Sequence, residues 1–340
     1  MKNKTNTLAL ACCAILLSLT TIGCKNKESK PLGTEATEVK AETGPDFKIS
    51  LAQWSLNNTF FGGKIDWANF KKTLKESPDD LLKGRDPMDF PAMAASYGIE
   101  SIELVNTFYF GKVDDMEYWK EFKKKCEEAG VSVGLIMCDA LGNLGDDDPE
   151  KLLEAVENHY KWVDIAKFLG AHSIRVNAAG EGTPEEVAKN AVNGLKALGK
   201  YAASKGINVI VENHGGHSSN GAWLSGIMGV INMDNVGTLP DFGNFCIERG
   251  PDGCVKEYDK YAGMKELMPY AKGVSAKSHE FDEEGNEVHS DYLRIMKIVK
   301  ESGFKGYIGI EYEGDQLSED EGIKATKALL EKVFAQLENN

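Results

Sequence analysis

The stretch that decides the fold is residues 207–216, which read INVIVENHGG. Its first half is apolar and β-branched, which is typical of a buried strand. It then ends on Glu212, an amide and His214, followed by two glycines. A strand built for burial therefore finishes in a cluster of ligand-type side chains, and the fold has to explain where such strand ends meet.

Similar runs recur along the chain, at residues 47–55, 99–106, 131–139, 171–178, 236–244, 271–281 and 307–314. Amphipathic segments such as 114–130, 149–170 and 183–206 separate them, and each of these ends on a glycine that suits a left-handed helix cap. Eight strands alternating with helices predict an α/β fold, a (β/α)8 TIM barrel over residues 47–340. An open doubly wound sheet would carry a glycine-rich phosphate turn after its first strand, and the sequence has none there.

The carboxyl ends of all strands in such a barrel converge on one face, so polar residues there share a pocket. Four successive runs carry, at or near their ends, Glu212, Asp241, His279 and Glu311. Buried carboxylates without a compensating charge are costly and repel one another. The sequence therefore predicts one divalent metal ion, which is Mn, Mg, Co or Zn, bound by these four side chains.

In its strand count and in this order of acid, acid, histidine and acid, the chain resembles the xylose-isomerase-like barrels. This sugar phosphate isomerase/epimerase family includes the tagatose and psicose epimerases, and the resemblance implies that the metal ligands come from the fifth to eighth strands. Two departures concern substrate contacts. Asn244 and Ser218 stand where the ketose epimerases often carry a histidine and a second glutamate, so we expect those contacts to differ.

Other polar residues are candidates by their facing along the strands. Lys277 shares a side with His279, and His214 follows Glu212, so both are candidate acid–base or substrate-binding groups. The alternative for Lys277 is a salt bridge to a ligand carboxylate. The predicted substrate-binding residues are Trp54, Gln53, Arg175, Asn177 and Asn244. The indole of Trp54 either stacks on a sugar or fills the barrel mouth.

The chemistry that this site predicts is proton transfer beside a sugar carbonyl. A divalent ion that holds a carbonyl and a neighbouring hydroxyl acidifies the C–H between them and stabilises an ene-diolate. Glu212 and Glu311 would remove and return the proton, so the predicted activity is that of a sugar isomerase or epimerase. Two alternatives stay open. One is a 3-keto-glycoside lyase or hydratase on the same site, and the other is a non-catalytic sugar-binding lipoprotein.

The N-terminus predicts export. Residues 1–24 combine a basic start, an apolar stretch and TIGC, which resembles a bacterial lipobox and makes Cys24 the expected lipid anchor. Residues 25–46 are polar and read as a flexible tether. The expected location is therefore the bacterial cell envelope, with the membrane contacted through the anchor alone.

Charge and cysteines limit the partners. The chain carries a formal charge of −14, and because residues 1–24 hold Lys2 and Lys4 but no acid, the remainder carries −16. Such an acidic protein repels phosphate backbones, so the predicted partner is a small carbohydrate and no nucleic acid. Cys246 and Cys254 either pair in an oxidising compartment or remain free thiols. The aromatic connection at 56–86 is either a lid or an elaborated surface loop.

Overall fold

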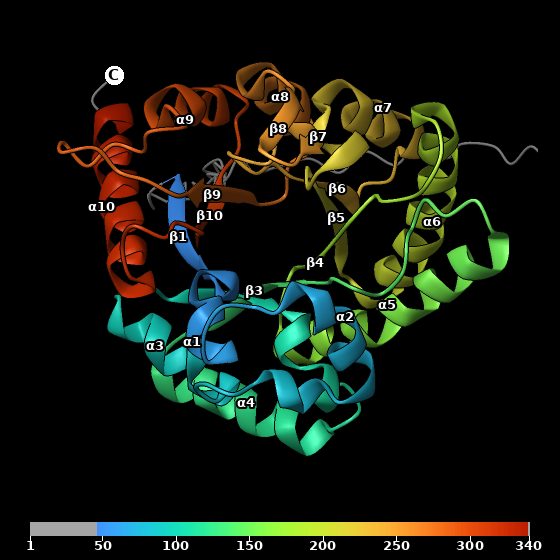
Figure 1. Ribbon diagram of the computed structural model, residues 1–340, viewed down its shortest axis with the longest axis horizontal. Coiled ribbons are helices and arrows are strands. Elements are labelled where there is room, and N and C mark those ends of the chain that lie inside the picture. Colours follow the sequence, from blue (N-terminus) through green and yellow to red (C-terminus); the bar gives the residue numbers. More distant parts are fainter. Residues whose placement is uncertain (1–45, 339–340) are drawn as a thin grey trace, which may run out of the picture. The chain divides into compact units, whose positions relative to one another are not determined.

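The computed structural model describes residues 46–338, and in that part of the chain eight parallel strands form one sheet in the order β6-β5-β4-β3-β2-β1-β10-β9. Figure 1 shows the strands inside a ring of helices. The predicted (β/α)8 architecture is confirmed. Each of the eight runs expected from the sequence contains one of these strands.

The strands of the barrel are β1 (Phe47–Ala52), β2 (Ser101–Val105), β3 (Ser132–Met137), β4 (Ser173–Val176), β5 (Asn208–Glu212), β6 (Val236–Leu239), β9 (Val274–Ser278) and β10 (Gly306–Tyr312). The α-helices are α1 (Asn57–Phe61), α2 (Trp67–Glu76), α3 (Phe90–Ser96), α4 (Met116–Ala129), α5 (Pro149–Leu169), α6 (Pro184–Lys205), α7 (Gly221–Ile231), α8 (Lys260–Leu267), α9 (Tyr292–Glu301) and α10 (Glu319–Glu338). The 3-10 helices are η1 (Gln53–Leu56), η2 (Pro78–Leu81), η3 (Pro87–Asp89), η4 (Asn106–Phe108), η5 (Phe110–Lys112), η6 (Gly216–Ser219) and η7 (Met268–Tyr270).

Local sequence signals account for the helix ends. Helix α5 begins at Pro149, and the side chain of Asp148 caps it by accepting a hydrogen bond from the backbone N–H of Glu150 at 2.9 Å. Helices α4, α5 and α6 each end at a glycine in the left-handed conformation. These caps fix where each helix turns back toward the next strand.

The barrel closes between β6 and β9. Two isolated parallel bridges join these strands, one between Thr238 and Ala271 and the other between Asp241 and Ser275. The N–H of Phe242 also donates to the carbonyl of Ser275 at 3.0 Å. The closing seam therefore runs through Asp241, one of the predicted metal ligands.

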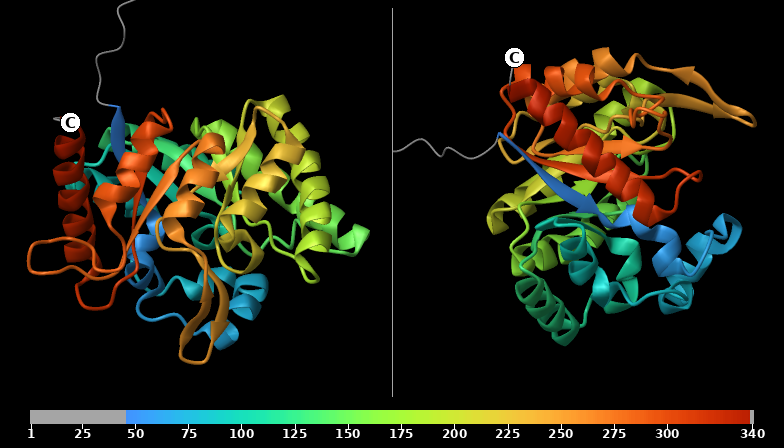
Figure 2. Two further views of the ribbon diagram at one scale, coloured as in Figure 1. Left: turned by 90° about the horizontal axis from the view of Figure 1, so that it is seen from above. Right: turned by 90° about the vertical axis from the view of Figure 1, so that its left-hand side faces the viewer.

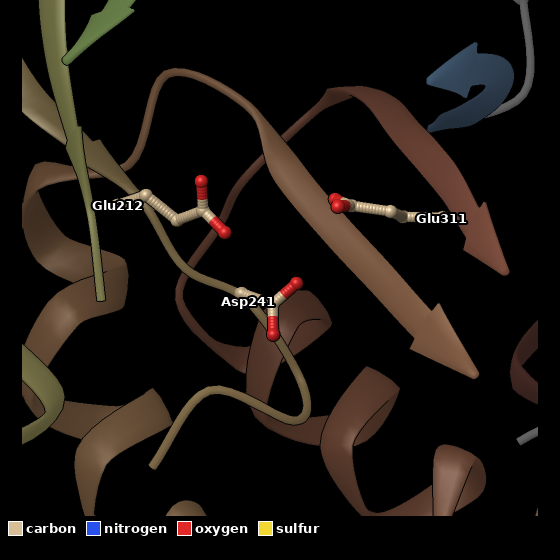
Figure 3. Close-up of side chains that lie close together, drawn as sticks. All are labelled: Glu212, Asp241 and Glu311. Carbon is tan, nitrogen blue, oxygen red and sulfur yellow. The ribbon is translucent and has the colours of Figure 1, made fainter. Parts of the chain in front are cut away.

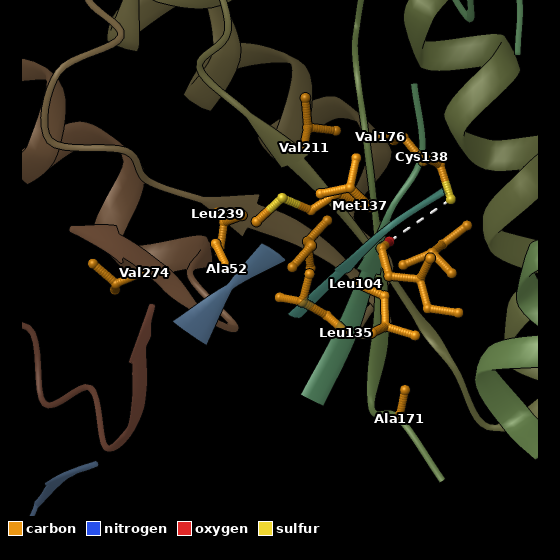
Figure 4. Close-up of a cluster of buried hydrophobic side chains, with 14 of the residues drawn as sticks. Ala52, Leu104, Leu135, Met137, Cys138, Ala171, Val176, Val211, Leu239 and Val274 are labelled. Atoms are coloured by element: carbon orange, nitrogen blue, oxygen red, sulfur yellow. Dashed lines mark hydrogen bonds between the residues drawn. The ribbon is translucent and has the colours of Figure 1, made fainter. Parts of the chain in front are cut away.

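The two faces of the strands differ in polarity. Successive side chains in a strand alternate between faces, so the inward-facing Glu212 has Val211 beside it on the opposite face. Val176, Val211 and Leu104 belong to the continuous buried core, part of which Figure 4 shows. Because apolar burial between strands and helices stabilises the barrel from outside, the barrel interior is free to carry polar groups.

Two segments are added to the barrel. Residues 56–86 contain α1 and α2 and pack through aromatic rings, with Phe61 stacked on Phe108 at 4.7 Å between centroids. The second addition follows β6 and is the antiparallel hairpin of β7 (Cys246–Gly250) and β8 (Gly253–Glu257), which projects in Figure 2. A disulfide joins Cys246 to Cys254 across this hairpin. The structure thus selects the paired form of these cysteines, while lid closure by residues 56–86 stays a prediction.

The predicted signal peptide at 1–24, its Cys24 and the tether up to residue 45 lie outside the described residues. Within residues 46–338, no helix combines the length and the apolar character that crossing a membrane requires.

Candidate functional site

Three carboxylates meet at the carboxyl ends of neighbouring strands. Glu212 is the last residue of β5, Asp241 follows β6, and Glu311 lies on β10. They expose 1%, 0% and 3% of their surface, and one oxygen from each lies within 4.8 Å of the others. Figure 3 shows the three carboxylate groups around a common space. The structure therefore brings together three of the four predicted metal ligands.

A serine links two of these acids. The hydroxyl of Ser275, on β9, lies 2.6 Å from Asp241 Oδ2 and 3.0 Å from Glu311 Oε2. Burial raises the pKa of Asp241 and raises that of Glu311 well above its ordinary value, although the charge of Lys277 opposes both shifts. When no cation lies between them, these two carboxyl groups therefore hold their protons more tightly than an ordinary aspartate or glutamate does.

Lys277 lies beside the three acids on the inner face of β9. Its ammonium group is 3.5 Å from Glu311 Oε1 and 3.0 Å from Glu313 Oε1, and it donates to Asn244 Oδ1 at 3.3 Å. Burial alone would lower the pKa of Lys277, but the surrounding carboxylates outweigh it and raise that pKa well above its ordinary value. The same ion pair holds the pKa of Glu313 at about 2 against the effect of burial. The salt bridge considered as the alternative for Lys277 is present.

Arg175 connects the three acids to a second polar group. Its Nη1 lies 2.6 Å from Asp139 Oδ1, and its Nε lies 2.8 Å from Glu212 Oε2. Asn177 also donates to Asp139 Oδ1, at 2.7 Å. Burial would raise the pKa of Asp139, but the charge of Arg175, the nearby His214 and these hydrogen bonds together hold it below its ordinary value. The predicted substrate-binding residues Arg175 and Asn177 thus lie next to Glu212.

Two predicted residues lie toward the edge of the site. His214 is exposed and follows the end of β5 by two residues, and its charge acts to lower the pKa of Asp139. Asn244 donates from its amide to Glu212 Oε1 at 2.8 Å, so it contacts a predicted ligand directly. Ser218, in the loop after β5, accepts a hydrogen bond from the backbone N–H of His214, which ties this loop into a turn.

His279 is not brought into the carboxylate group. It follows the last residue of β9, its ring lies 6.1 Å from that of His289, and its backbone N–H donates to Glu287 at 3.3 Å. The strand rises about 3.3 Å per residue, so His279 lies about 13 Å along the chain from Ser275. The imidazole of His279 thus lies outside the group that the three carboxylates form.

The two candidates at the end of β1 are occupied by structural contacts. Gln53 is fully buried, donates to the hydroxyl of Tyr109 at 2.8 Å and accepts from the backbone N–H of Val105 at 3.1 Å. In the structure these contacts join the end of β1 to the end of β2 and the loop after it, and the role of Gln53 in substrate binding stays a prediction. The half-buried ring of Trp54 packs against Phe61 and Phe108, which agrees with the interpretation that it fills the barrel mouth.

The sequence reading missed four polar residues of the barrel interior and mouth, which are Glu103, Asp139, Ser275 and Glu313. Asp139 closes the run at 131–139 and Glu313 shares the facing of Glu311, so strand-end position and alternation could have indicated both. Glu103 is buried on β2 and accepts from Ser50 at 2.6 Å. Nothing in the sequence distinguishes Ser275 from an ordinary strand serine.

The residues present fit a divalent cation. Glu212 Oε2 is buried and accepts no hydrogen bond, although Arg175 Nε lies 2.8 Å away as an ion-pair partner. Arg175 and Lys277 are the cations paired with these acids. The carboxylates that interact electrostatically with one another or with these two cations are Glu103, Asp139, Glu212, Asp241, Glu311 and Glu313. Such an excess of buried negative charge is relieved by a bound cation or by protons.

A family model for the xylose isomerase-like TIM barrel matches residues 91–333. The chain belongs to this family. Membership in the xylose isomerase-like TIM barrel family confirms the resemblance drawn from the strand count and the order of acids. The comparison with curated proteins found none that matches the chain.

Solved structures of other xylose isomerase-like barrels share the fold. A xylose isomerase-like TIM barrel protein from Mycobacterium smegmatis, in complex with magnesium, is 16% identical with a TM-score of 0.60, over 86% of this chain and 96% of that one. D-allulose 3-epimerase from Methylomonas sp. is 15% identical with a TM-score of 0.59, over 85% and 99%. 3-keto-D-glucoside 4-epimerase from E. coli is 12% identical with a TM-score of 0.57, over 85% and 100%. At these identities the likeness shows the fold alone.

Proposed function

We propose that this protein is a divalent-metal-dependent sugar isomerase or epimerase that moves a proton on the carbon beside a carbonyl group. The observation that carries the proposal is the convergence of Glu212, Asp241 and Glu311 within 4.8 Å at the carboxyl ends of the strands. The magnesium complex and the two epimerases of the same fold support it.

A divalent ion, when bound, polarises a carbonyl and a neighbouring hydroxyl and stabilises the negative charge of an ene-diolate. The side chains supply the proton transfers. Glu212 and Glu311 come from β5 and β10, which are separated by β6 and β9 in the closed barrel. One carboxylate takes the proton from carbon and the other returns a proton to the opposite face, which inverts the centre.

The neighbouring polar groups would hold the sugar. Asn177 Oδ1 is buried without a hydrogen-bond partner and would accept from a sugar hydroxyl. The exposed His214 near Asp139 would contact the part of the substrate that faces solvent. Because Arg175 pairs with both Asp139 and Glu212, it fixes the distance between this binding region and the proton-transferring acid.

A second candidate function, elimination from a 3-keto glycoside, is supported by the position of Lys277. Its ammonium group contacts both Glu311 and Asn244, so a proton donor stands next to a candidate base. The carboxylate would take the C–H proton, the bond from the β carbon to the glycosidic oxygen would break, and Lys277 would protonate the departing oxygen. The reverse addition would make the enzyme a hydratase.

The proposed location is the bacterial cell envelope, with Cys24 as the lipid anchor. The Cys246–Cys254 disulfide supports this location because such bonds persist in oxidising compartments. An envelope enzyme meets glycosides and free sugars before it meets cytosolic sugar phosphates, so the proposed substrates are unphosphorylated.

The test uses purified protein with added Mn²⁺ in deuterated water, followed by NMR. Free ketoses are expected to gain solvent deuterium at an inverted centre, whereas a 3-keto glycoside is expected to release its aglycone. Glu311→Gln should lose on the order of a hundredfold or more in either activity, whereas Glu301→Gln, an exposed position at the end of α9, should retain it. Sugar binding without proton exchange in either class would favour the sugar-binding lipoprotein instead.

A further inference from the structure

The inner face of β9 meets the three carboxylates through the ammonium group of Lys277, which is a cation, and through the hydroxyl of Ser275. Ser275 exposes 1% of its surface, and its hydroxyl oxygen lies within 3.0 Å of oxygens from both Asp241 and Glu311. Its backbone also forms the bridge with Asp241 that closes the barrel. The hydroxyl is therefore fixed at the level of the acids by both side-chain and main-chain contacts.

Within the described residues, the nitrogen atoms that contact the three acids have no lone pair to offer. The ammonium of Lys277 and the guanidinium of Arg175 are cations paired with carboxylates, and the Asn244 nitrogen is an amide that donates to Glu212. The imidazoles of His214, two residues after Glu212, and of His279, four residues after Ser275, both lie outside the group of acids. The available donors are thus oxygens.

We propose that this metal centre has an oxygen-only donor set, formed by Glu212, Asp241, Glu311 and the hydroxyl of Ser275, and that it takes a hard divalent ion such as Mg²⁺ or Mn²⁺. Carboxylate and hydroxyl oxygens suit these ions, whereas imidazole and thiolate favour zinc. The inference rests on the proposed metal-dependent function and specifies its cofactor. It also removes His279 from the ligand set that the family resemblance implied.

Two variants of the full-length protein test this proposal by isothermal titration of metal-free samples with Mn²⁺, Mg²⁺ and Zn²⁺. His279→Ala should leave the Kd for Mn²⁺ within about threefold of the wild-type value, because losing even a residue that only orients a metal ligand typically costs about 10–100-fold in affinity. Ser275→Cys changes the side chain by one atom and should raise the affinity for Zn²⁺ relative to Mn²⁺ by about tenfold or more, because thiolate is a soft ligand.

Cobalt provides a readout that does not depend on activity. With Co²⁺ bound, the Ser275→Cys variant should show a near-ultraviolet thiolate-to-cobalt absorption band that the wild-type protein lacks. Cobalt binding without that band, or a tenfold loss of Mn²⁺ affinity in His279→Ala, would overturn the oxygen-only centre. If Ser275→Cys does not fold, as judged by circular dichroism, the His279→Ala titration decides. Absence of any metal binding by the wild-type protein would overturn the proposed metal-dependent function as well.

Discussion

Glu103 should make the stability of the barrel depend on pH. Its carboxyl group is buried on β2, accepts one hydrogen bond from Ser50, and has a second oxygen, Oε2, without a partner. Burial raises the pKa of Glu103 from 4.5 to about 7, against the effect of the Ser50 hydrogen bond. Glu103→Gln keeps the size of the side chain and removes the ionisable proton.

The sign follows from which state binds the proton more tightly. The unfolded chain releases the proton of Glu103 near pH 4.5, whereas the folded protein holds it until about pH 7. Stability is therefore fully present below the unfolded pKa and falls as the pH rises between these two values. Since one pKa unit corresponds to about 1.4 kcal/mol, the loss amounts to about 3 kcal/mol.

The assay is urea unfolding of wild-type protein and Glu103→Gln at about pH 5 and pH 8 with a chelator present, a range that covers most of the titration between pH 4.5 and about 7. The free energy of unfolding of the variant, relative to wild type, should rise by about 2.5 kcal/mol between the two pH values, because part of the loss has already occurred at pH 5. Glu100→Gln, at an exposed glutamate just before β2, is the matched control and should show no such change. An equal difference between Glu103→Gln and wild type at both pH values would refute the reasoning.

Three further predictions concern the metal and the anchor. Asp241→Ala should abolish stoichiometric Mn²⁺ binding, and full metal content by elemental analysis would contradict the assigned site. Because Asp241 and Glu311 have raised pKa values, a bound cation must displace protons from them. Calorimetry should therefore show that Mn²⁺ affinity falls on acidification, on the order of tenfold per pH unit for each proton displaced. An Mn²⁺ affinity that does not change with pH would contradict competition between the cation and protons. Cys24→Ala should release the protein from the membrane fraction, and unchanged association on fractionation would end the lipoprotein proposal.

Much of the fold was predictable because the pattern of apolar residues along the sequence indicates which segments are buried. The eight β-branched runs are buried on both faces or nearly so, which leaves a strong signal in sequence. The hairpin of β7 and β8 was missed because all of its residues except the buried Cys246 are at least partly exposed and show no apolar alternation. Only its two cysteines drew attention. Helices α1 and α2 were read as an irregular connection, since each is short and rich in aromatic residues that pack locally.

The candidate site was predictable where position and residue type agreed. Glu212, Asp241 and Glu311 are acids at strand ends, and the convergence of those ends in a barrel brings them together. His279 was predicted as a ligand because imidazole is a common metal ligand. Alternation along a strand indicates which face of the sheet a side chain lies on, but not how far along the barrel axis it lies. Ser275 shows the opposite case, in which an unremarkable residue type occupies the central position because the closing bridge with Asp241 puts it there.

The seam between β6 and β9 both closes the barrel and carries residues of the candidate site. Asp241 and Ser275 form one of the two isolated bridges that complete the circle of strands, and their side chains also meet at the three acids. A contact that draws these side chains together also draws together β6 and β9, the two end strands of the sheet. Substitutions at either residue are therefore expected to change the proposed metal site and the closure of the barrel together.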